Sequence, residues 1–294
     1  MHIFEKIADL REWLARQRKS GRSIGFAPTM GALHEGHLSL VRAAKAAGDV
    51  SVVSIFVNPT QFNDPEDLRR YPRMPEHDIA LLQRAGCQAL FMPELEEIYP
   101  PGQDLTVLLD FGPLTEVMEG QFRPGHFQGM ATVVKRLLDI VEPQRLYMGQ
   151  KDFQQLTIVR RMLQLLAMPV ELVMCPTVRE LDGLAMSSRN LRLTPPMRAA
   201  APALFRALTA AREDFVAGKP VADIREAALA TLREAGLQPE YFEIVDGYTL
   251  LPVETQEAGP FVVACVAAWA GQVRLIDNLI LTGEGDGAFQ TPAG

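Results

Sequence analysis

Short apolar runs alternate with amphipathic stretches through the first 175 residues of the chain. The apolar runs are rich in Val, Ile and Phe and lie at 23–28, 50–57, 88–93, 145–149 and 170–175. Stretches with apolar residues at helical spacing lie between them, at 37–48, 75–86, 129–141 and 153–167. Because strands that alternate with helices form βαβ units, this pattern predicts a doubly wound parallel sheet with helices on both faces.

The segment before the first run predicts a helix. Ile3, Ile7, Leu10 and Leu14 lie at helical spacing with charged residues between them, and Gly21 is a plausible stop. We therefore expect one amphipathic helix that starts near Ile3.

The pattern changes after Cys175. Two long helical segments, at about 195–217 and 221–235, are followed by three strand-like runs at 240–247, 261–269 and 272–281. Helices followed by consecutive strands are typical of an α+β unit. The sequence thus predicts an α/β domain at 1–175, a smaller α+β C-terminal lid domain at 176–283 and a flexible tail at 284–294.

Composition narrows the classes of function. The 294 residues include 29 Lys and Arg against 36 Asp and Glu, a formal net charge of −7. This balance argues against binding to nucleic acid or to an anionic membrane. No apolar stretch reaches the length of a membrane span, and Cys87, Cys175 and Cys265 are isolated in apolar runs. We expect a cytoplasmic protein with three buried thiols.

The most informative stretch is FAPTMGALHEGHLSLV, at 26–41. An apolar strand ends at Pro28, a glycine-containing turn follows, and a helix begins near Gly36, so free backbone N–H groups and the positive helix end favour a phosphate. His34 and His37, three residues apart, can lie on one side of this helix start. The alternatives are two surface histidines or a zinc site, but HEGH lacks a third ligand at zinc spacing.

This stretch resembles the HxGH signature of a nucleotidyl-transferring and adenylate-forming superfamily that has a Rossmann-like core. Over about residues 1–281 the chain also resembles the pantothenate synthetase family, in SIFVNPTQF (54–62), DLRRYPR (67–73), RPGHFQGMATVV (123–134), KDFQQL (151–156) and PTVRELDGLAMSSRN (176–190). The resemblance implies a homodimer that condenses (R)-pantoate with β-alanine through a pantoyl adenylate. ATP would be cleaved to AMP and pyrophosphate, with Mg²⁺.

The resemblance also implies the site residues. It assigns ATP binding to Met30, Gly31, Ala32, Leu33, His34, Glu35, Gly36, His37, Gly149, Gln150, Lys151, Asp152, Val178, Met186, Ser187, Ser188 and Arg189. Four of these are expected to act in catalysis, since charge that develops on phosphate needs donors and cations: His37 first, then His34, Lys151 and Arg189. Relatives often carry Glu where this chain has Gln150.

Of these assignments, Lys151 also has support from the residues, and the segment 186–189 has a second resemblance. Lys151 follows an apolar strand and Gly149, which places it at the carboxyl edge of a parallel sheet, where α/β proteins bind ligands. The segment 186–189 resembles a mobile KMSKS-type loop in which an arginine supplies the cation. Without the resemblance, Lys151 could equally well be a surface lysine, and the segment 186–189 would be interpreted as a turn or a helix cap.

The remaining assignments concern pantoate, β-alanine and the metal. The resemblance places Gln61 and Gln155 on pantoate, Gln61 also near β-alanine, and Asn58 in the same pocket, where neutral amides suit hydroxyl groups. Met30, Phe62 and Val134 could face the methyl groups of pantoate. Family analogy makes Asp78 the candidate Mg²⁺ ligand. A further group supports the pocket or forms surface salt bridges: Tyr71, Arg73, Glu119, Arg123 and His126.

Three other functions fit an HxGH motif. A nucleotidyltransferase would keep AMP or CMP on its product, and a nucleotide-sensing module would bind without reacting. A relative of the aminoacyl-tRNA synthetases is disfavoured by the acidic charge balance and by the lack of an additional domain for tRNA. The sensing module would lack catalytic cations, whereas this chain has His34, His37, Lys151 and Arg189.

Overall fold

The computed structural model describes residues 1–62, 65–255 and 259–283, so the tail predicted at 284–294 lies outside the described residues. Its larger sheet has six parallel strands in the order β1-β4-β3-β2-β5-β6. In that order the strands are His2–Phe4, Ala89–Phe91, Val50–Ile55, Ile24–Thr29, Arg145–Gly149 and Glu171–Cys175. The parallel sheet expected from the alternation of runs is confirmed.

Helices cover both faces of this sheet. Neighbouring residues of a strand point to opposite faces, and Phe26 and Ala27 of β2 belong to two different apolar clusters. The cluster of Phe26 includes side chains of α1 (Ile7–Lys19), α7 (His126–Val141) and α8 (Phe153–Leu165). The cluster of Ala27 includes side chains of α2 (Glu35–Ala46) and α4 (Pro75–Ala85). The sheet is therefore doubly wound.

The start of the chain differs from the prediction. Residues His2–Phe4 form an edge strand in which Ile3 pairs with Leu90, and α1 begins only at Ile7. The backbone N–H of His2 donates to the carbonyl oxygen of Gln88 at 2.9 Å. The predicted amphipathic helix is confirmed as α1, but it begins at Ile7 because residues 2–4 pair with the edge of the sheet.

A second unit follows β6. It contains α9 (Pro195–Ala200), α10 (Ala203–Val216) and α11 (Val221–Glu234), then the antiparallel strands β7 (Gln238–Asp246), β8 (Val262–Ala270) and β9 (Val273–Thr282). The expected α+β arrangement is confirmed, but the segment at 195–217 is two helices. Pro202, at the N-cap of α10, has no N–H with which to continue the preceding helix.

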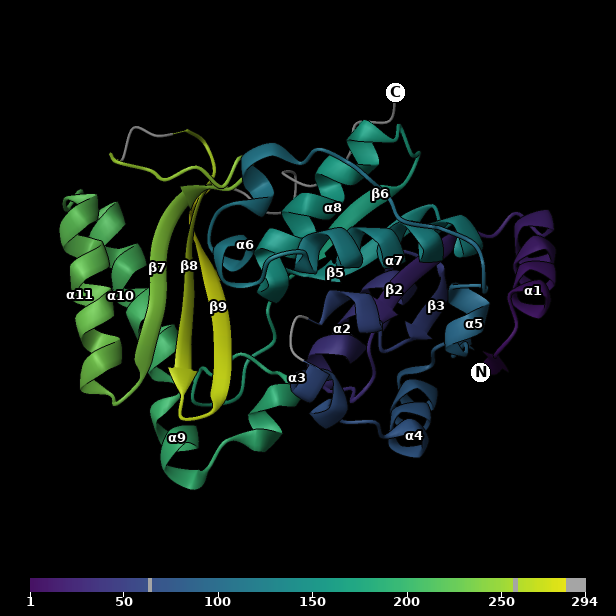
Figure 1. The fold of residues 1–294 in the computed structure, drawn as a ribbon, viewed down its shortest axis with the longest axis horizontal. Coiled ribbons are helices and arrows are strands. Elements are labelled where there is room, and N and C mark those ends of the chain that lie inside the picture. Colours follow the sequence, from purple (N-terminus) through teal and green to yellow (C-terminus); the bar gives the residue numbers. More distant parts are fainter. Residues whose placement is uncertain (63–64, 256–258, 284–294) are drawn as a thin grey trace.

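The small sheet is buried on both faces. In Figure 1, α10 and α11 lie on the side of β7–β9 that faces away from the larger sheet. Val262 and Ala264 of β8 pack with these helices, whereas Val263 and Cys265 pack into the core of the larger unit. One sheet therefore joins the two units. Cys87, Cys175 and Cys265 are all buried and unpaired, as expected.

The shorter elements lie mainly in the connections between strands, and several of them contain residues assigned to the site. They are η1 (Pro59–Gln61), α3 (Pro65–Arg70), α5 (Leu95–Ile98), η2 (Gly112–Thr115), α6 (Glu119–Phe122), η3 (Gln150–Asp152) and η4 (Ser188–Arg192).

A buried amide in β9 fixes η3. The Asn278 amide nitrogen Nδ2 donates to the carbonyl oxygens of Gln150 and Lys151 at 2.9 and 2.8 Å, and Oδ1 accepts from Gln150 Nε2 at 3.1 Å. Only 2% of Asn278 is exposed. The last strand of the small sheet therefore holds the backbone on which Lys151 is mounted.

We expect Asn278→Ala to lower the free energy of unfolding by about 1–3 kcal/mol, because it leaves buried carbonyl groups without a donor. Asn278→Asp is the matched variant, since it keeps the side-chain size and Oδ1 but loses both donated bonds. Urea unfolding of the three proteins measures the difference. Stability close to wild type in both variants would contradict the role given to the amide.

Candidate active site

The site lies where the strand order of the larger sheet reverses. From β2 the sheet continues through β3 and β4 on one side and through β5 and β6 on the other. In open α/β sheets such a reversal leaves a crevice at the carboxyl ends of the strands. The turn after β2 and the η3 segment after β5 therefore border the same crevice.

A buried carboxylate shapes the turn after β2. Gly31 and Ala32 both have positive φ, at 83° and 49°. Asp78 of α4 accepts the N–H of Ala32 at 2.9 Å and that of Leu33 at 2.7 Å, one on each oxygen. Thr29 Oγ1 accepts the Gly31 N–H and donates to the carbonyl oxygen of Ser54. The turn is thus held from behind by hydrogen bonds.

This arrangement favours a structural role for Asp78 over the predicted role as a Mg²⁺ ligand. The residue is 1% exposed, both its oxygens are used by the turn, and it does not line the cavity described below. Its position supports a role in shaping the turn. Within the described ranges, no three His, Cys, Asp or Glu side chains come together in a way that could hold a metal ion.

The two histidines form the first turn of α2. His34 is the N-cap residue, and its Nδ1 accepts the N–H of Gly36 at 3.1 Å, while His37 Nδ1 lies 3.3 Å from the backbone nitrogen of His34. The ring centroids are 4.1 Å apart. Because both Nδ1 atoms accept, the proton of each neutral ring is assigned to Nε2. Each ring is therefore a neutral Nε2–H donor.

Burial keeps these rings neutral. It lowers the pKa of His34 to about 4 and that of His37 to about 3, and the Lys151 ammonium and, for His37, the neighbouring ring act in the same direction. The sequence located the pair correctly. It did not indicate that the rings cap the helix, although His at the N-cap and at the third helical position is the signal that could have done so.

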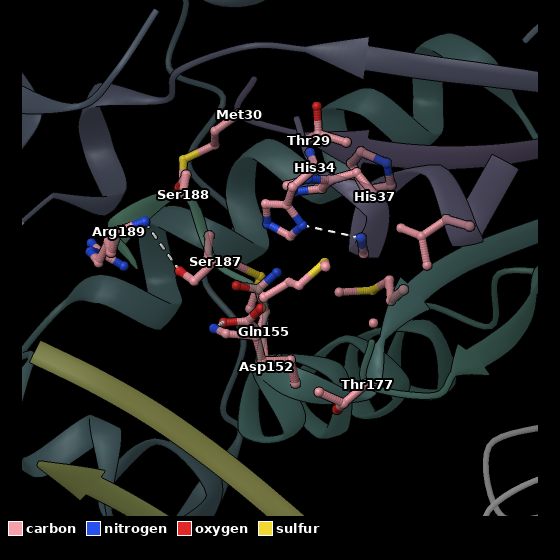
Figure 2. Close-up of a pocket in the computed structure, with 18 of the residues that line it drawn as sticks. Thr29, Met30, His34, His37, Asp152, Gln155, Thr177, Ser187, Ser188 and Arg189 are labelled. Atoms are coloured by element: carbon pink, nitrogen blue, oxygen red, sulfur yellow. Dashed lines mark hydrogen bonds and ion pairs between the residues drawn. The ribbon is translucent and has the colours of Figure 1, made fainter. Parts of the chain in front are cut away.

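The cavity at this crevice has a volume of about 210 Å³ and is bordered on one side by the histidines. Figure 2 shows His34 and His37 side by side, with Gln155, Asp152 and Thr177 across the cavity and Ser187, Ser188 and Arg189 along one flank. Residues assigned to ATP or pantoate that line it are Met30, His34, Gly36, His37, Gln61, Gly149, Lys151, Asp152, Gln155, Val178, Met186, Ser187, Ser188 and Arg189.

Some assigned residues do not line the cavity. Gly31, Ala32, Leu33 and Glu35 are absent from its wall, although they belong to the same turn and helix start. Gln150 is also absent, because its side chain is directed to Asn278 between the two units. Conversely, the sequence did not single out Thr177, whose buried Oγ1 has no partner within the described part of the chain. The position of Thr177 next to Val178, which the resemblance assigns to ATP, is the sequence signal that could have identified it.

The cations come from two segments. Lys151 of η3 is mostly buried, and its Nζ lies 3.9 Å from Asp152 Oδ1. Arg189 lies within η4, where Ser187 Oγ accepts its backbone N–H at 3.3 Å. The Met186 N–H donates to the carbonyl oxygen of Val178 at 3.0 Å, which ties the 186–189 loop to the end of the crevice. The smaller unit therefore supplies one wall of the cavity.

The amide end of the cavity is built on η1. Gln61 Nε2 lies 2.9 Å from Met30 Sδ, and Asn58 Nδ2 donates to Gln61 Oε1 at 3.2 Å. Asn58 also donates to the carbonyl oxygen of Gly129 and accepts from Tyr99, so it supports Gln61 and does not itself reach the cavity wall.

A second cavity of about 80 Å³ adjoins the first and shares Met30, Gln61, Lys151, Asp152, Gln155 and Arg189 with it. Glu119, Arg123, His126 and Phe62 line this second cavity, while Tyr71 and Val134 line the first. Arg73 is exposed and lines neither.

The buried rings predict a pH dependence of stability. Their folded pKa values lie below the ordinary 6.5, so the unfolded chain binds more protons and stability falls as pH drops below 6.5. Each such ring contributes up to about 1.4 kcal/mol per pH unit. We expect the unfolding free energy of His37→Asn to fall less steeply than that of wild type between pH 6.5 and 5. Equal slopes in urea unfolding would contradict this.

Comparison with known proteins identifies the family. The model of the pantoate-beta-alanine ligase family matches residues 2–280. Pantothenate synthetase of Porphyromonas gingivalis is 48% identical over 279 residues, which cover 95% of this chain and 99% of the relative. Pantothenate synthetase of Thermotoga neapolitana is 49% identical over 283 residues, which cover 96% and 100%.

Solved structures agree with this result. The crystal structure of pantothenate synthetase from Thermus thermophilus has a TM-score of 0.90 and 48% identity, with 96% of this chain and 100% of that chain covered. Pantoate-beta-alanine ligase from Francisella tularensis, solved in complex with beta-gamma ATP and beta-alanine, has a TM-score of 0.79 and 34% identity, with 96% and 98% covered. The chain belongs to the pantoate-beta-alanine ligase family, the pantothenate synthetases.

Proposed function

We propose that this protein condenses (R)-pantoate with β-alanine at the expense of ATP, through a pantoyl adenylate, and releases AMP and pyrophosphate. Family membership supports the overall reaction. The observation that carries the proposal is the pair of neutral imidazoles at the start of α2, which border one cavity with Lys151 and Arg189. This set of donors and cations is suited to a reacting triphosphate.

In the first step, a carboxylate oxygen of pantoate attacks the α-phosphorus of ATP, and the bond to the β-phosphate breaks with its electron pair leaving on pyrophosphate. Negative charge therefore grows on phosphate oxygens. The Nε2–H groups of His34 and His37 would donate to these oxygens, and the N-terminus of α2 adds a favourable dipole. Lys151 and Arg189 would balance the charge of the leaving pyrophosphate.

Mg²⁺ would enter as part of the substrate MgATP. The ion prefers phosphate oxygens, water and one or two carboxylates. Among the side chains that line the 210 Å³ cavity, Asp152 supplies the carboxylate, and that side chain is 52% exposed. It therefore fits the cation better than Asp78, which is occupied by the turn.

Pantoate would occupy the end of the cavity near η1. Gln61 and Gln155 offer neutral amides that can both donate to and accept from its hydroxyl groups. Met130, Val133 and Val134 of α7 line the same cavity and supply an apolar wall for its methyl groups. This mixture of a few polar groups on an apolar surface is typical of small-molecule sites.

The proposed function is tested by separating the two half-reactions. Labelled pyrophosphate should exchange into ATP only when pantoate is present, without β-alanine. Addition of β-alanine should then give the amide and AMP in equal amounts. Formation of ADP, or a product that retains the nucleotide, would overturn the proposal, and the latter would favour a nucleotidyltransferase.

His37→Asn tests the donor. Asparagine can still accept the His34 N–H through its side-chain oxygen, but it lacks a donor at the position of Nε2. We expect the pantoate-dependent exchange rate to fall by about 10²–10³, as for other lost transition-state donors. His77→Asn, on the exposed side of α4, is the control and should exchange at the wild-type rate. If only the KM for ATP changes, His37 contributes to ATP binding and not to stabilisation of the transition state.

Within the described residues, no helix has both the length and the apolar character needed to cross a membrane. The cytoplasmic location expected from the composition and the homodimer implied by the resemblance stay predictions. Light scattering by the purified protein tests the oligomeric state.

A further inference from the structure

The two cations of the larger cavity are carried by different segments. Lys151 belongs to η3, which follows β5 of the six-stranded sheet, whereas Arg189 belongs to η4, within the loop 177–190 that follows β6. The strand β9 contacts both η3 and η4. The proposed adenylation brings both cations to one triphosphate, so the relative position of the two segments matters for the rate.

A buried ion pair joins β9 to the start of this loop. Arg179 donates to both oxygens of Asp277, from Nη1 at 2.5 Å and from Nη2 at 3.0 Å. Its Nη2 also donates to the carbonyl oxygen of Asn278, and its Cζ lies 4.0 Å from the centroid of the Phe205 ring of α10. The side chains of Asp277 and Arg179 are 2% and 15% exposed. Two parallel hydrogen bonds to one carboxylate fix both the position and the orientation of a guanidinium.

Arg179 in turn holds the part of the loop that leads to Arg189. Its Nη1 donates to the carbonyl oxygen of Gly183 at 3.1 Å, and its backbone pairs with Ala185 in an isolated antiparallel bridge. Just beyond Arg189, Asn190 Nδ2 donates to the carbonyl oxygen of Ala185 at 3.0 Å. Arg189 therefore lies between contacts that lead back to Arg179 on both sides.

Asp277 and Asn278 point to opposite faces of the small sheet. Asp277 lies opposite Val266, whose side chain packs with α10 and α11, and Asn278 lies opposite Cys265, whose side chain packs into the larger unit. The Asn278 amide therefore meets η3 on one face, while the Asp277 carboxylate meets the loop 177–190 on the other. Two adjacent residues of β9 thus hold both of the segments that carry cations.

We propose that Asp277 is a positioning residue for the adenylation step: through Arg179 it sets where Arg189 lies relative to Lys151, so that both cations meet the same triphosphate. The inference rests on the proposed function and adds to it a residue that does not line the 210 Å³ cavity.

Asp277→Asn is the first test. It keeps the size of the side chain and one oxygen but loses the charge and one of the two acceptors. We expect the pantoate-dependent pyrophosphate exchange rate to fall about 10–10²-fold, because a small displacement of a group that stabilises the transition state has an effect of this size. The KM for pantoate should not change, since Gln61 and Gln155 lie on other segments, η1 and α8.

The second half-reaction separates this role from a general loss of folded enzyme. The protein is loaded with the adenylate by MgATP, pantoate and inorganic pyrophosphatase, then mixed with β-alanine, and amide formation is followed in a single turnover. Because pyrophosphate has already left, Asp277→Asn should form the amide near the wild-type rate. Asp277 also borders the 80 Å³ cavity, so an unchanged rate here excludes direct action of the carboxylate on the amine.

Asp49→Asn is the matched control. Asp49 is also buried and accepts from Arg145 and Tyr147, both at 2.7 Å. It precedes the first residue of β3, however, and so lies at the end of the larger sheet opposite to the crevice. This variant also breaks a buried ion pair and should be less stable than wild type, but its folded protein should catalyse pyrophosphate exchange at the wild-type rate.

A double-mutant cycle tests whether Asp277 acts through Arg179. Burial raises the pKa of Asp277, and the charges of Arg179 and Lys151 oppose that rise, so the carboxylate also has a direct electrostatic route to Lys151. If it acts through Arg179, the double variant Arg179→Gln, Asp277→Asn should catalyse pyrophosphate exchange no more slowly than the slower single variant, since one contact can be lost only once. Arg179→Lys, which keeps the charge, should retain part of the rate.

Amide hydrogen exchange, followed by mass spectrometry, locates the effect in the chain. Peptides that cover the loop 177–190 should exchange faster in Asp277→Asn than in wild type, because the loop opens more readily without its ion pair. Peptides that cover β2 should not change. This measurement requires no substrate and no activity.

Four results would overturn the inference: wild-type pyrophosphate exchange in Asp277→Asn, equal slowing of both half-reactions, a double variant whose loss is the product of the two single losses, or unchanged amide exchange across 177–190. If wild type shows no pantoate-dependent pyrophosphate exchange, the proposed function fails. The amide exchange then decides separately whether Asp277 holds the loop.

Discussion

The site depends on the two hydrogen bonds that the buried Asp78 carboxylate accepts from the turn after β2. Ala32 has positive φ, which is unfavourable for a residue with a Cβ, so this conformation persists only where the surroundings impose it. The turn delivers the chain to His34, the N-cap of α2. A carboxylate that does not reach the cavity thus determines where the two imidazoles lie.

The same chain sets the proton positions of three histidines by different means. In His34 and His37, Nδ1 accepts a backbone N–H group, so the ring proton lies on Nε2 and each ring is a donor there. In His126, Nδ1 donates to a backbone carbonyl oxygen, so Nε2 of that ring is an acceptor. All three rings are neutral because burial lowers their pKa. The main chain, more than charged neighbours, decides whether each ring can give or take a proton.

Local patterns predicted much of the molecule. The parallel sheet, its helices and the consecutive strands of the smaller unit followed from periodicity, and His34, His37, Lys151 and Arg189 line one cavity. The features that the patterns missed depend on contacts distant in sequence. Ile3 pairs with Leu90, Asp78 bonds a turn 46 residues earlier, and Gln150 bonds Asn278, 128 residues later. No spacing rule within a window of the chain could reveal these partners.

The amide of Asn278 also bears on the order of events during synthesis. It lies in β9, the last strand among the described residues, yet it holds the backbone of Lys151, 127 residues earlier. A nascent chain that reaches only to β6 contains all six strands of the larger sheet but lacks this support. Contacts between such distant segments close late, because the entropy lost in closing a long loop must be offset first. The lysine of the cavity is therefore fixed in place only after the ribosome has delivered β9.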